Sequence, residues 1–133
     1  MSGERDLEIL ISSMNPVLRP GTFVFVTVPE AAAPGVRAAA TITEDEGVTL
    51  VLTKEEADAR GWGYEFEAAW LTLRVHSALD AVGLTAAVSS RLAGIGISCN
   101  VIAGYHHDHL LVPIDDASHA LAELKALAAD GRG

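Results

Sequence analysis

The second half of the sequence predicts an α+β fold arranged as a split βαβ sandwich with an antiparallel sheet. Three apolar runs, at 70–76, 97–103 and 109–114, have strand character, and segments 84–95 and 116–128 have helical periodicity. Their order of strand, helix, strand, strand, helix makes most of that sandwich. The loop Asp80-Ala81-Val82-Gly83-Leu84 joins the first strand to the first helix and is marked by its glycine.

Length and composition limit the class of protein. Half of the 133 residues are apolar, which suffices for a core in one compact body or two small lobes. A net charge of −9 argues against a nucleic acid partner. The longest uncharged run, 92–107, is too short and too polar to cross a membrane. With one cysteine, Cys99, and no secretion pattern at the N-terminus, we expect a cytoplasmic protein with no membrane association.

The first half has a less regular pattern of its own. It predicts a helix over 6–14 that Pro16 closes, and a strand over 22–28 that is rich in β-branched and aromatic residues. Strands over 39–43 and 48–53 flank a turn at 44–47, and Thr53 with Glu56 opens a short helix. The sequences of 50–57 and 110–117 are weakly similar, which suggests a duplication. We therefore expect two interleaved lobes, 1–65 and 66–133.

The second half lacks one strand. A complete split βαβ unit has a fourth strand after its second helix, but nothing strand-like follows residue 128. An uncovered sheet edge invites pairing, so we expect segment 22–28 to lie there, from the same chain or from a second copy. The two halves are then intertwined rather than separable.

The loop before helix 84–95 predicts an anion site. The apolar stripe of that helix places its first amides beside the end of strand 70–76, where free N–H groups attract a carboxylate or phosphate. Gly83 permits close approach, and His76, Ser77 and Asp80 offer polar groups. This prediction needs unpaired N–H groups around Ser77. The alternative is that Ser77 and Asp80 only cap the helix.

Segment 73–98 resembles the start of an ACT domain. That family shows Asp-x-x-Gly-Leu after a strand, then a helix ending in Leu-Ala-x-x-Gly-Ile. Its pattern is matched here by Asp80, Gly83, Leu84, Leu92, Ala93, Gly96 and Ile97. The continuation 99–113 resembles more narrowly the small stand-alone proteins with CASTOR-like tandem ACT domains. The resemblance is good over 66–128 and loose over 14–65.

The resemblance implies a ferredoxin-like βαββαβ fold that binds amino acids or related metabolites at interfaces between ACT units. The ligand would lie against the loop after the first strand, with contacts from the second strand. Carried over by position, the ligand-binding residues are His76, Ser77, Leu79, Val82, Gly83, Leu84, Asn100, Val101 and Ile102. Val82 stands where the family often has proline, so the loop is less rigid and the ligand cannot be inferred from relatives.

The segment Tyr105-His106-His107-Asp108-His109 supports a different hypothesis, because imidazoles and carboxylates bind zinc and move protons. Strand alternation places His107 and His109 on one face, and a third ligand could come from His76 or His119. The favoured alternative is a polar hairpin tip. We expect Cys99 to be an inert thiol, and no catalytic triad, phosphate-binding glycine loop or carboxylate pair stands out.

Together these observations favour a regulatory protein that binds a small metabolite, with an amino acid as the favoured ligand, and forms a homodimer. It would not be an enzyme and would need no cofactor. An oligomerisation module without a ligand is the first alternative, and a metal-binding protein using the cluster from His106 to His109 is the second.

Overall fold

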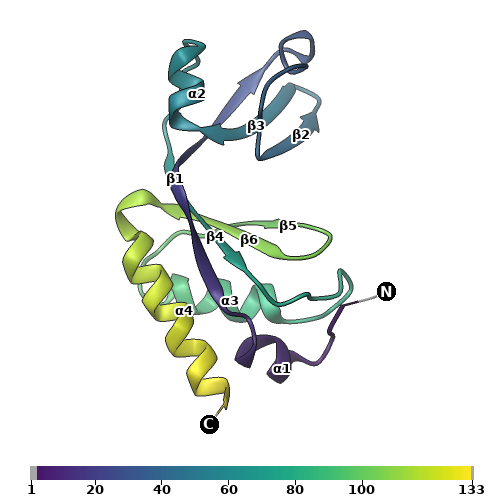
Figure 1. Cartoon of the computed structure of the whole chain (residues 1–133), viewed down its shortest axis with the longest axis vertical. Helices are drawn as coiled ribbons and strands as arrows, with labels where there is room; N and C mark the ends of the chain where they lie inside the picture. The colour runs from purple at the N-terminus through teal and green to yellow at the C-terminus, as the bar shows by residue number, and fades with distance from the viewer. Residues whose placement is uncertain (1–2, 133) are drawn as a thin grey trace. The chain divides into compact units, whose positions relative to one another are not determined.

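The computed structural model describes residues 3–132, which form two compact units (Figure 1). The larger unit combines the residues up to 20 with those from 69 onward, and the smaller unit holds residues 21–68. Two strands, β1 (Pro16–Val28) and β4 (Glu67–Leu73), begin in one unit and end in the other. Residues 3–20 therefore belong to the same unit as the second half of the chain.

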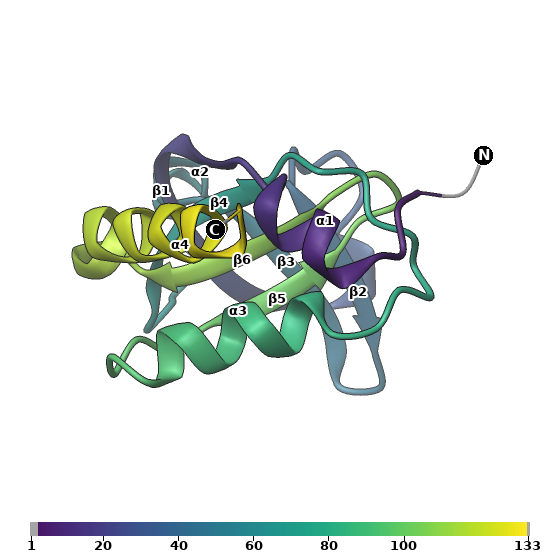
Figure 2. The same cartoon turned by 90° about the horizontal axis from the view of Figure 1, so that it is seen from below.

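The larger unit is a sheet covered by helices on one face. Its hydrogen-bonded strand order is β1-β4-β6-β5, with β5 (Asn100–Ala103) antiparallel to β6 (Asp108–Pro113). Helices α1 (Leu7–Ser12), α3 (Leu84–Ala93) and α4 (Ala117–Arg132) lie on the same side of this sheet (Figure 2). A short 3-10 helix, η2 (Ile114–Asp116), leads into α4. This is the predicted α+β, ferredoxin-like arrangement, and the fold class is confirmed.

The core of the larger unit follows the two periodicities seen in the sequence. Alternate residues of β4 and β6 point to the helices, and each helix contributes an apolar stripe. The buried set is Leu10, Met14, Ala69, Leu71, Leu73, Leu84, Val88, Leu92, Ile97, Leu110, Val112, Ala120, Leu124 and Ala128. Full burial of one such leucine is worth roughly 1.5–3 kcal/mol. This packing fixes the start of α3 close to the end of β4.

The missing fourth strand comes from the N-terminus of the chain. Within the larger unit the first part of β1 lies beside β4, where the Arg74 amide donates to the Asn15 carbonyl over 3.3 Å. The Arg19 guanidinium lies 5.1 Å from the centre of the Trp70 ring. The strand beside β4 is thus β1, which contains the predicted segment 22–28, and within the larger unit this place is taken by its residues up to Pro20.

Pro16 begins a strand rather than closing a helix. Helix α1 already ends at Ser12, and Asn15 turns the chain with a φ of 40°. A proline has no N–H to offer a neighbouring strand, so it is tolerated at a strand start and on an edge. In the larger unit β1 is an edge strand next to β4. Pro16 and Pro20 are compatible with that position.

The smaller unit is a three-stranded antiparallel sheet in the order β2-β3-β1. Strands β2 (Ala40–Glu44) and β3 (Gly47–Thr53) are joined by a tight turn, and β3 pairs with β1 so that Val26 lies opposite Leu50. A 3-10 helix, η1 (Glu30–Ala32), follows β1. The Thr53 hydroxyl accepts from the Glu56 amide and caps α2 (Lys54–Ala59), as the sequence predicted.

Element boundaries in the second half differ from the prediction by a few residues. Strand β4 starts and ends three residues earlier than expected, and β5 is shorter. Helix α3 stops at Ala93 because Gly94 and Gly96 follow, the latter with a φ of 80°. Ile97 is buried but not in a strand, and its amide donates to the Leu92 carbonyl over 3.0 Å. Helix α4 runs to Arg132, beyond the predicted end at 128.

Candidate functional site

The loop from β4 to α3 is held in place by the N-terminal segment. Glu4 forms a parallel bridge with Ser77, in which the Glu4 amide donates to the His76 carbonyl over 2.8 Å. The Ala78 amide donates back to the Glu4 carbonyl over 2.9 Å. The Ala81 amide is also used, since it donates to the Ala78 carbonyl over 3.0 Å. The expectation of unpaired N–H groups around Ser77 is therefore wrong for Ala78 and Ala81.

The start of α3 carries no side-chain cap. Gly83 is the N-cap residue with a φ of 105°, and no side chain hydrogen bonds to the cap. The first intrahelical bond joins the Ala87 amide to the Gly83 carbonyl over 2.8 Å. Ser77 and Asp80 do not cap the helix, because Ser77 donates to Asp108 and Asp80 pairs with Arg5. The first-turn amides thus keep the geometry of an anion site.

A hollow of about 120 Å³ opens at this helix start, and we call it the helix pocket. On one side are the first residues of α3, with the positive end of the helix dipole. The lining also includes Asp108, whose carboxylate accepts a hydrogen bond from the Ser77 hydroxyl over 3.2 Å. The pocket therefore offers a site for a negative group and a site for a positive group. Its lining residues are Ser77, Ala78, Leu79, Ala81, Gly83, Leu84, Thr85, Ala103 and Asp108.

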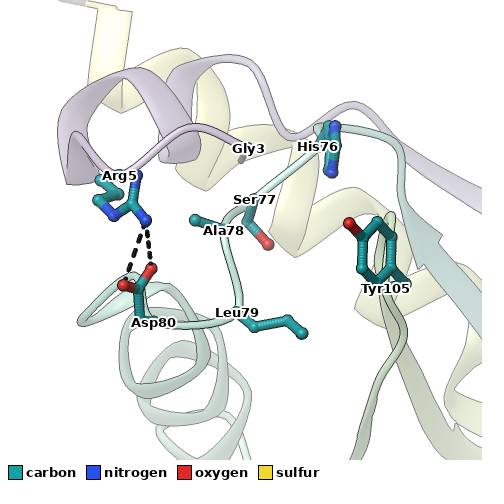
Figure 3. Close-up of a pocket in the computed structure, with 8 residues that line it drawn as sticks. All are labelled: Gly3, Arg5, His76, Ser77, Ala78, Leu79, Asp80 and Tyr105. Carbon is teal, nitrogen blue, oxygen red and sulfur yellow. Dashed lines mark hydrogen bonds and ion pairs between the residues drawn. The ribbon is translucent and has the colours of Figure 1, made fainter. Parts of the chain in front are cut away.

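A second hollow of about 250 Å³, here called the N-terminal pocket, uses the same loop (Figure 3). Arg5 and Asp80 face each other at one end, with 2.9 Å between Nη2 and Oδ1, while His76 and Tyr105 lie at the other end. The hydrogen bond from Arg5 lowers the pKa of Asp80 from its usual value, so this carboxylate is ionised at neutral pH. Gly3, Ser77, Ala78 and Leu79 complete the lining.

The histidine cluster lies at the hairpin between β5 and β6. The His106 ring lies 5.3 Å from that of His76, and His107 Nδ1 lies 3.2 Å from the Val75 carbonyl oxygen. His109 Nδ1 lies 3.0 Å from the Thr72 hydroxyl, and burial lowers the pKa of its imidazole. Within residues 3–132, no three His, Cys, Asp or Glu side chains are grouped so that they could hold a metal ion.

The structure gathers part of the predicted site in these two hollows. His76, Ser77, Leu79, Gly83 and Leu84 line one or both of them. Val82 lines neither and is 82% exposed. The hairpin contributes Ala103 to the helix pocket, whereas its neighbours on β5 line neither hollow. The roles predicted for Val82, Asn100, Val101 and Ile102 stay predictions.

The predicted site omitted eight of the lining residues: Gly3, Arg5, Ala78, Ala81, Thr85, Ala103, Tyr105 and Asp108. Thr85 and Asp108 could have been found, because one follows the glycine loop directly and the other lies in the segment singled out for its histidines. Tyr105 belongs to that segment too. The sequence holds no pattern that links Gly3 and Arg5 to the loop, because they reach it only through tertiary contacts across more than seventy positions. Arg5 and Asp80, for example, are 75 positions apart.

Comparison with known families identifies the chain. Two family models, each described as an ACT domain, match residues 2–69 and residues 65–126. The chain belongs to the ACT-domain family. The two matches cover nearly the whole sequence and lie in tandem, as the resemblance implied. None of the curated proteins compared with this ACT-domain chain matches it.

Three solved structures are similar to this ACT-domain protein. A Vibrio cholerae protein of unknown function, described as a possible transport protein, is 46% identical, with a TM-score of 0.83 over 92% of this chain and 95% of that one. An Agrobacterium tumefaciens protein is 18% identical, with a TM-score of 0.66 over 85% and 87%. The ligand-free regulatory subunit of Thermus thermophilus aspartate kinase is 11% identical, with a TM-score of 0.63 over 86% and 97%. The last two show the fold alone.

Across the described part of the ACT-domain chain, residues 3–132, every helix is too short or too polar to traverse a lipid bilayer.

Proposed function

We propose that this ACT-domain protein binds an L-amino acid in the helix pocket and acts as a regulator rather than as an enzyme. One observation carries the proposal: the start of α3 has no side-chain cap and opens into a hollow whose lining also includes Asp108. The ligand carboxylate accepts from the amides of Leu84 and Thr85. The ligand ammonium group contacts Asp108.

The charges in the helix pocket favour this orientation. The unpaired amides and the helix dipole attract an anion at the N-terminus of a helix. The hydroxyl of Ser77 donates to one oxygen of Asp108, and a carboxylate has lone pairs for further donors. A volume of about 120 Å³ is below the range of roughly 300–1,000 Å³ for drug-sized ligands. It suits the charged head of an amino acid, with the side chain directed outward.

Family membership supports a regulatory role. Two tandem ACT matches cover the chain, and the Thermus thermophilus relative by fold is itself a regulatory subunit. A ligand regulates only by binding two states with different affinity. We propose that the two states differ in the association of two copies, and that the protein forms a homodimer of chains with ACT-like lobes at 1–65 and 66–133. The contacts predicted for Val82, Asn100, Val101 and Ile102 belong to this proposal.

Thr85 provides a sharp test. Thr85→Asp places a negative charge in the first turn of α3, which favours the helix but repels a carboxylate. Thr85→Asn introduces a side chain of the same shape as aspartate but without its charge. We expect calorimetric titration with proteinogenic L-amino acids to show binding by the wild type and by Thr85→Asn, and at least about tenfold weaker binding by Thr85→Asp. Equal affinity of Thr85→Asp and wild type would refute the placement of the carboxylate.

A second candidate function is association without a ligand, as an oligomerisation module. It is favoured by the exposure of large apolar side chains on the loop and the hairpin, with Leu79 and Tyr105 each 66% exposed and Val82 82% exposed. Exposed apolar groups clustered on one region are common at protein interfaces. This function would be favoured if the protein sediments as a dimer and calorimetric titration with each amino acid shows no heat of binding.

A further inference from the structure

The loop that lines the helix pocket is paired with a stretch of chain far away in the sequence. Figure 3 shows Gly3 of this stretch beside the loop. From here on, the N-terminal segment means the four residues Gly3, Glu4, Arg5 and Asp6. The loop contributes four residues to the lining of the helix pocket, Ser77, Ala78, Leu79 and Ala81. None of the four described residues of the N-terminal segment belongs to that lining, so the segment contacts the loop without filling the pocket.

The backbone of Glu4 holds the loop on both sides of Ser77. The Glu4 amide donates to the His76 carbonyl over 2.8 Å, and the Glu4 carbonyl accepts from the Ala78 amide over 2.9 Å. Ser77 lies between these two bonds, and its hydroxyl donates to the Asp108 carboxylate over 3.2 Å. The N-terminal segment therefore positions a hydrogen bond between two residues that line the helix pocket.

Gly3 allows the segment to lie this close to the loop. A Cβ atom at position 3 would be 2.5 Å from the His76 carbonyl oxygen, 2.7 Å from the Ser77 carbonyl carbon and 2.8 Å from the Ala78 nitrogen. All three are backbone atoms, so the clash cannot be relieved by rotating a side chain. Any residue larger than glycine at this position must move the segment and the loop apart.

The same stretch of chain reaches both ends of the loop. The Asp6 side chain caps α1, so the N-terminal segment leads directly into a helix whose Leu10 is fully buried. Leu7, the first residue of α1, lies against the start of α3, because a Cβ atom on Gly83 would be 3.0 Å from a terminal methyl group of Leu7. The loop is thus contacted near Ser77 and again at Gly83.

We propose that the N-terminal segment is a detachable support that positions the loop for ligand binding, with Gly3 and Glu4 as positioning residues that do not contact the ligand. This inference rests on the proposed function and adds the regulation of its site. The segment docks on the loop and detaches as a unit, and an amino acid in the helix pocket binds the docked state more tightly. By reciprocity, a bound amino acid stabilises the docked segment by the same factor.

The composition of the segment allows it to detach without unfolding the larger unit. Glu4, Arg5 and Asp6 have polar side chains and Gly3 has none, so the segment adds no apolar side chain to the core. Segments with few buried apolar contacts open locally at a much lower free energy than the core does. Because Leu10 remains buried, α1 stays in place when the segment leaves the loop.

Amide hydrogen exchange followed by NMR tests the docking of the segment. The reporters are the amides of Glu4 and Ala78, which donate the two hydrogen bonds. In Gly3→Ala both should exchange at least about tenfold faster than in the wild type. Glu4→Pro removes one of the two donors and should speed exchange at Ala78 in the same way. Gly63→Ala is the matched control, because a Cβ atom on Gly63 would have no described atom within 4 Å, and it should leave both rates unchanged.

Calorimetric titration with proteinogenic L-amino acids tests the effect on binding. Gly3→Ala should bind the amino acid at least about fivefold more weakly than the wild type, while Gly63→Ala binds it equally. Urea unfolding of Gly3→Ala should give the wild-type free energy, because the core is unchanged. In the wild type, a saturating amino acid should slow the exchange of the Glu4 amide by a comparable factor, although Glu4 does not line the helix pocket. A purely structural role of the segment would not produce this response at Glu4.

The outcomes separate the support from the pocket. Faster exchange in Gly3→Ala with unchanged affinity would overturn the positioning role and leave the proposed function standing. Wild-type exchange rates in Gly3→Ala, or a Glu4 amide that does not respond to a bound amino acid, would overturn the support in the same way. If no amino acid binds to the wild type, the proposed function fails and the positioning role fails with it.

Discussion

Gly83 is the residue whose replacement tests the geometry of the helix start most directly. It caps α3 in a left-handed conformation, with a φ of 105°. A residue with a Cβ atom in such a conformation costs about 1–2 kcal/mol relative to glycine. A Cβ atom here would also lie 3.0 Å from one terminal methyl group of Leu7 and 3.3 Å from the other. Leu7 is 37% exposed and can move aside, so this contact adds a few tenths of a kcal/mol at most.

We therefore expect Gly83→Ala to lower the free energy of unfolding by about 1–2.5 kcal/mol. Gly96→Ala is the matched control at the other end of α3, with a φ of 80° and no atom within 4 Å of its Cβ position. It should cost about 1–2 kcal/mol from the backbone alone. Urea unfolding of both variants, followed by circular dichroism, gives the two free energies.

Ligand binding then separates the two glycine variants. Gly83→Ala moves the amides of Leu84 and Thr85 and should weaken amino acid binding in the helix pocket, whereas Gly96→Ala should leave it unchanged. A Gly83→Ala variant as stable as the wild type, or a Gly96→Ala variant that weakens binding equally, would contradict this role of Gly83.

Two further predictions concern a partly buried histidine and the packing of α3 on α4. Burial lowers the pKa of His109 below 6.5, and the neighbouring His107 lowers it further. As the pH falls, the unfolded chain therefore takes up a proton that the folded chain does not. The free energy of unfolding should be highest above about pH 6.5 and should fall as the pH drops toward the pKa of His109 in the folded state. Urea unfolding from about pH 7.5 to about pH 5.5 should show this slope, and His109→Asn should flatten it. Arg91 links α3 to α4 through Glu123 at 2.7 Å and Asp130 at 3.4 Å. Arg91→Gln should lower the free energy of unfolding by about 1 kcal/mol, more than Arg60→Gln, which breaks the 2.7 Å pair with Glu56 at the end of α2. An equal effect of the two variants would contradict the cross-helix role of Arg91.

The elements of the larger unit could be predicted because each has a clear period. Alternating residues such as Leu71 and Leu73 mark a strand, and the stripe with Val88 and Leu92 marks a helix. The origin of the fourth strand could not be predicted in this way. Pro16 and Pro20 weaken the strand pattern of 16–20, and only their edge position in the larger unit makes them acceptable.

The candidate site was predictable only where its residues are neighbours in sequence. The loop from His76 to Leu84 was found because a glycine before an amphipathic helix has a direct structural meaning. The pairing of Ala78 with Glu4 was not, because a backbone hydrogen bond leaves no trace in the side chains that make it. The same is true of Arg5, whose partner Asp80 is 75 positions away.

The supply of an edge strand by residues 16–20 sets the order in which the chain can fold during synthesis. These residues leave the ribosome about 50 positions before β4 begins its part of the larger unit. At about 5–20 residues per second, the first strand waits roughly 2–10 s for its partner. The larger unit therefore cannot close until more than half of the chain has been made, and in a nascent chain halted before residue 69 the residues 16–20 lack β4, the strand they lie beside in the larger unit.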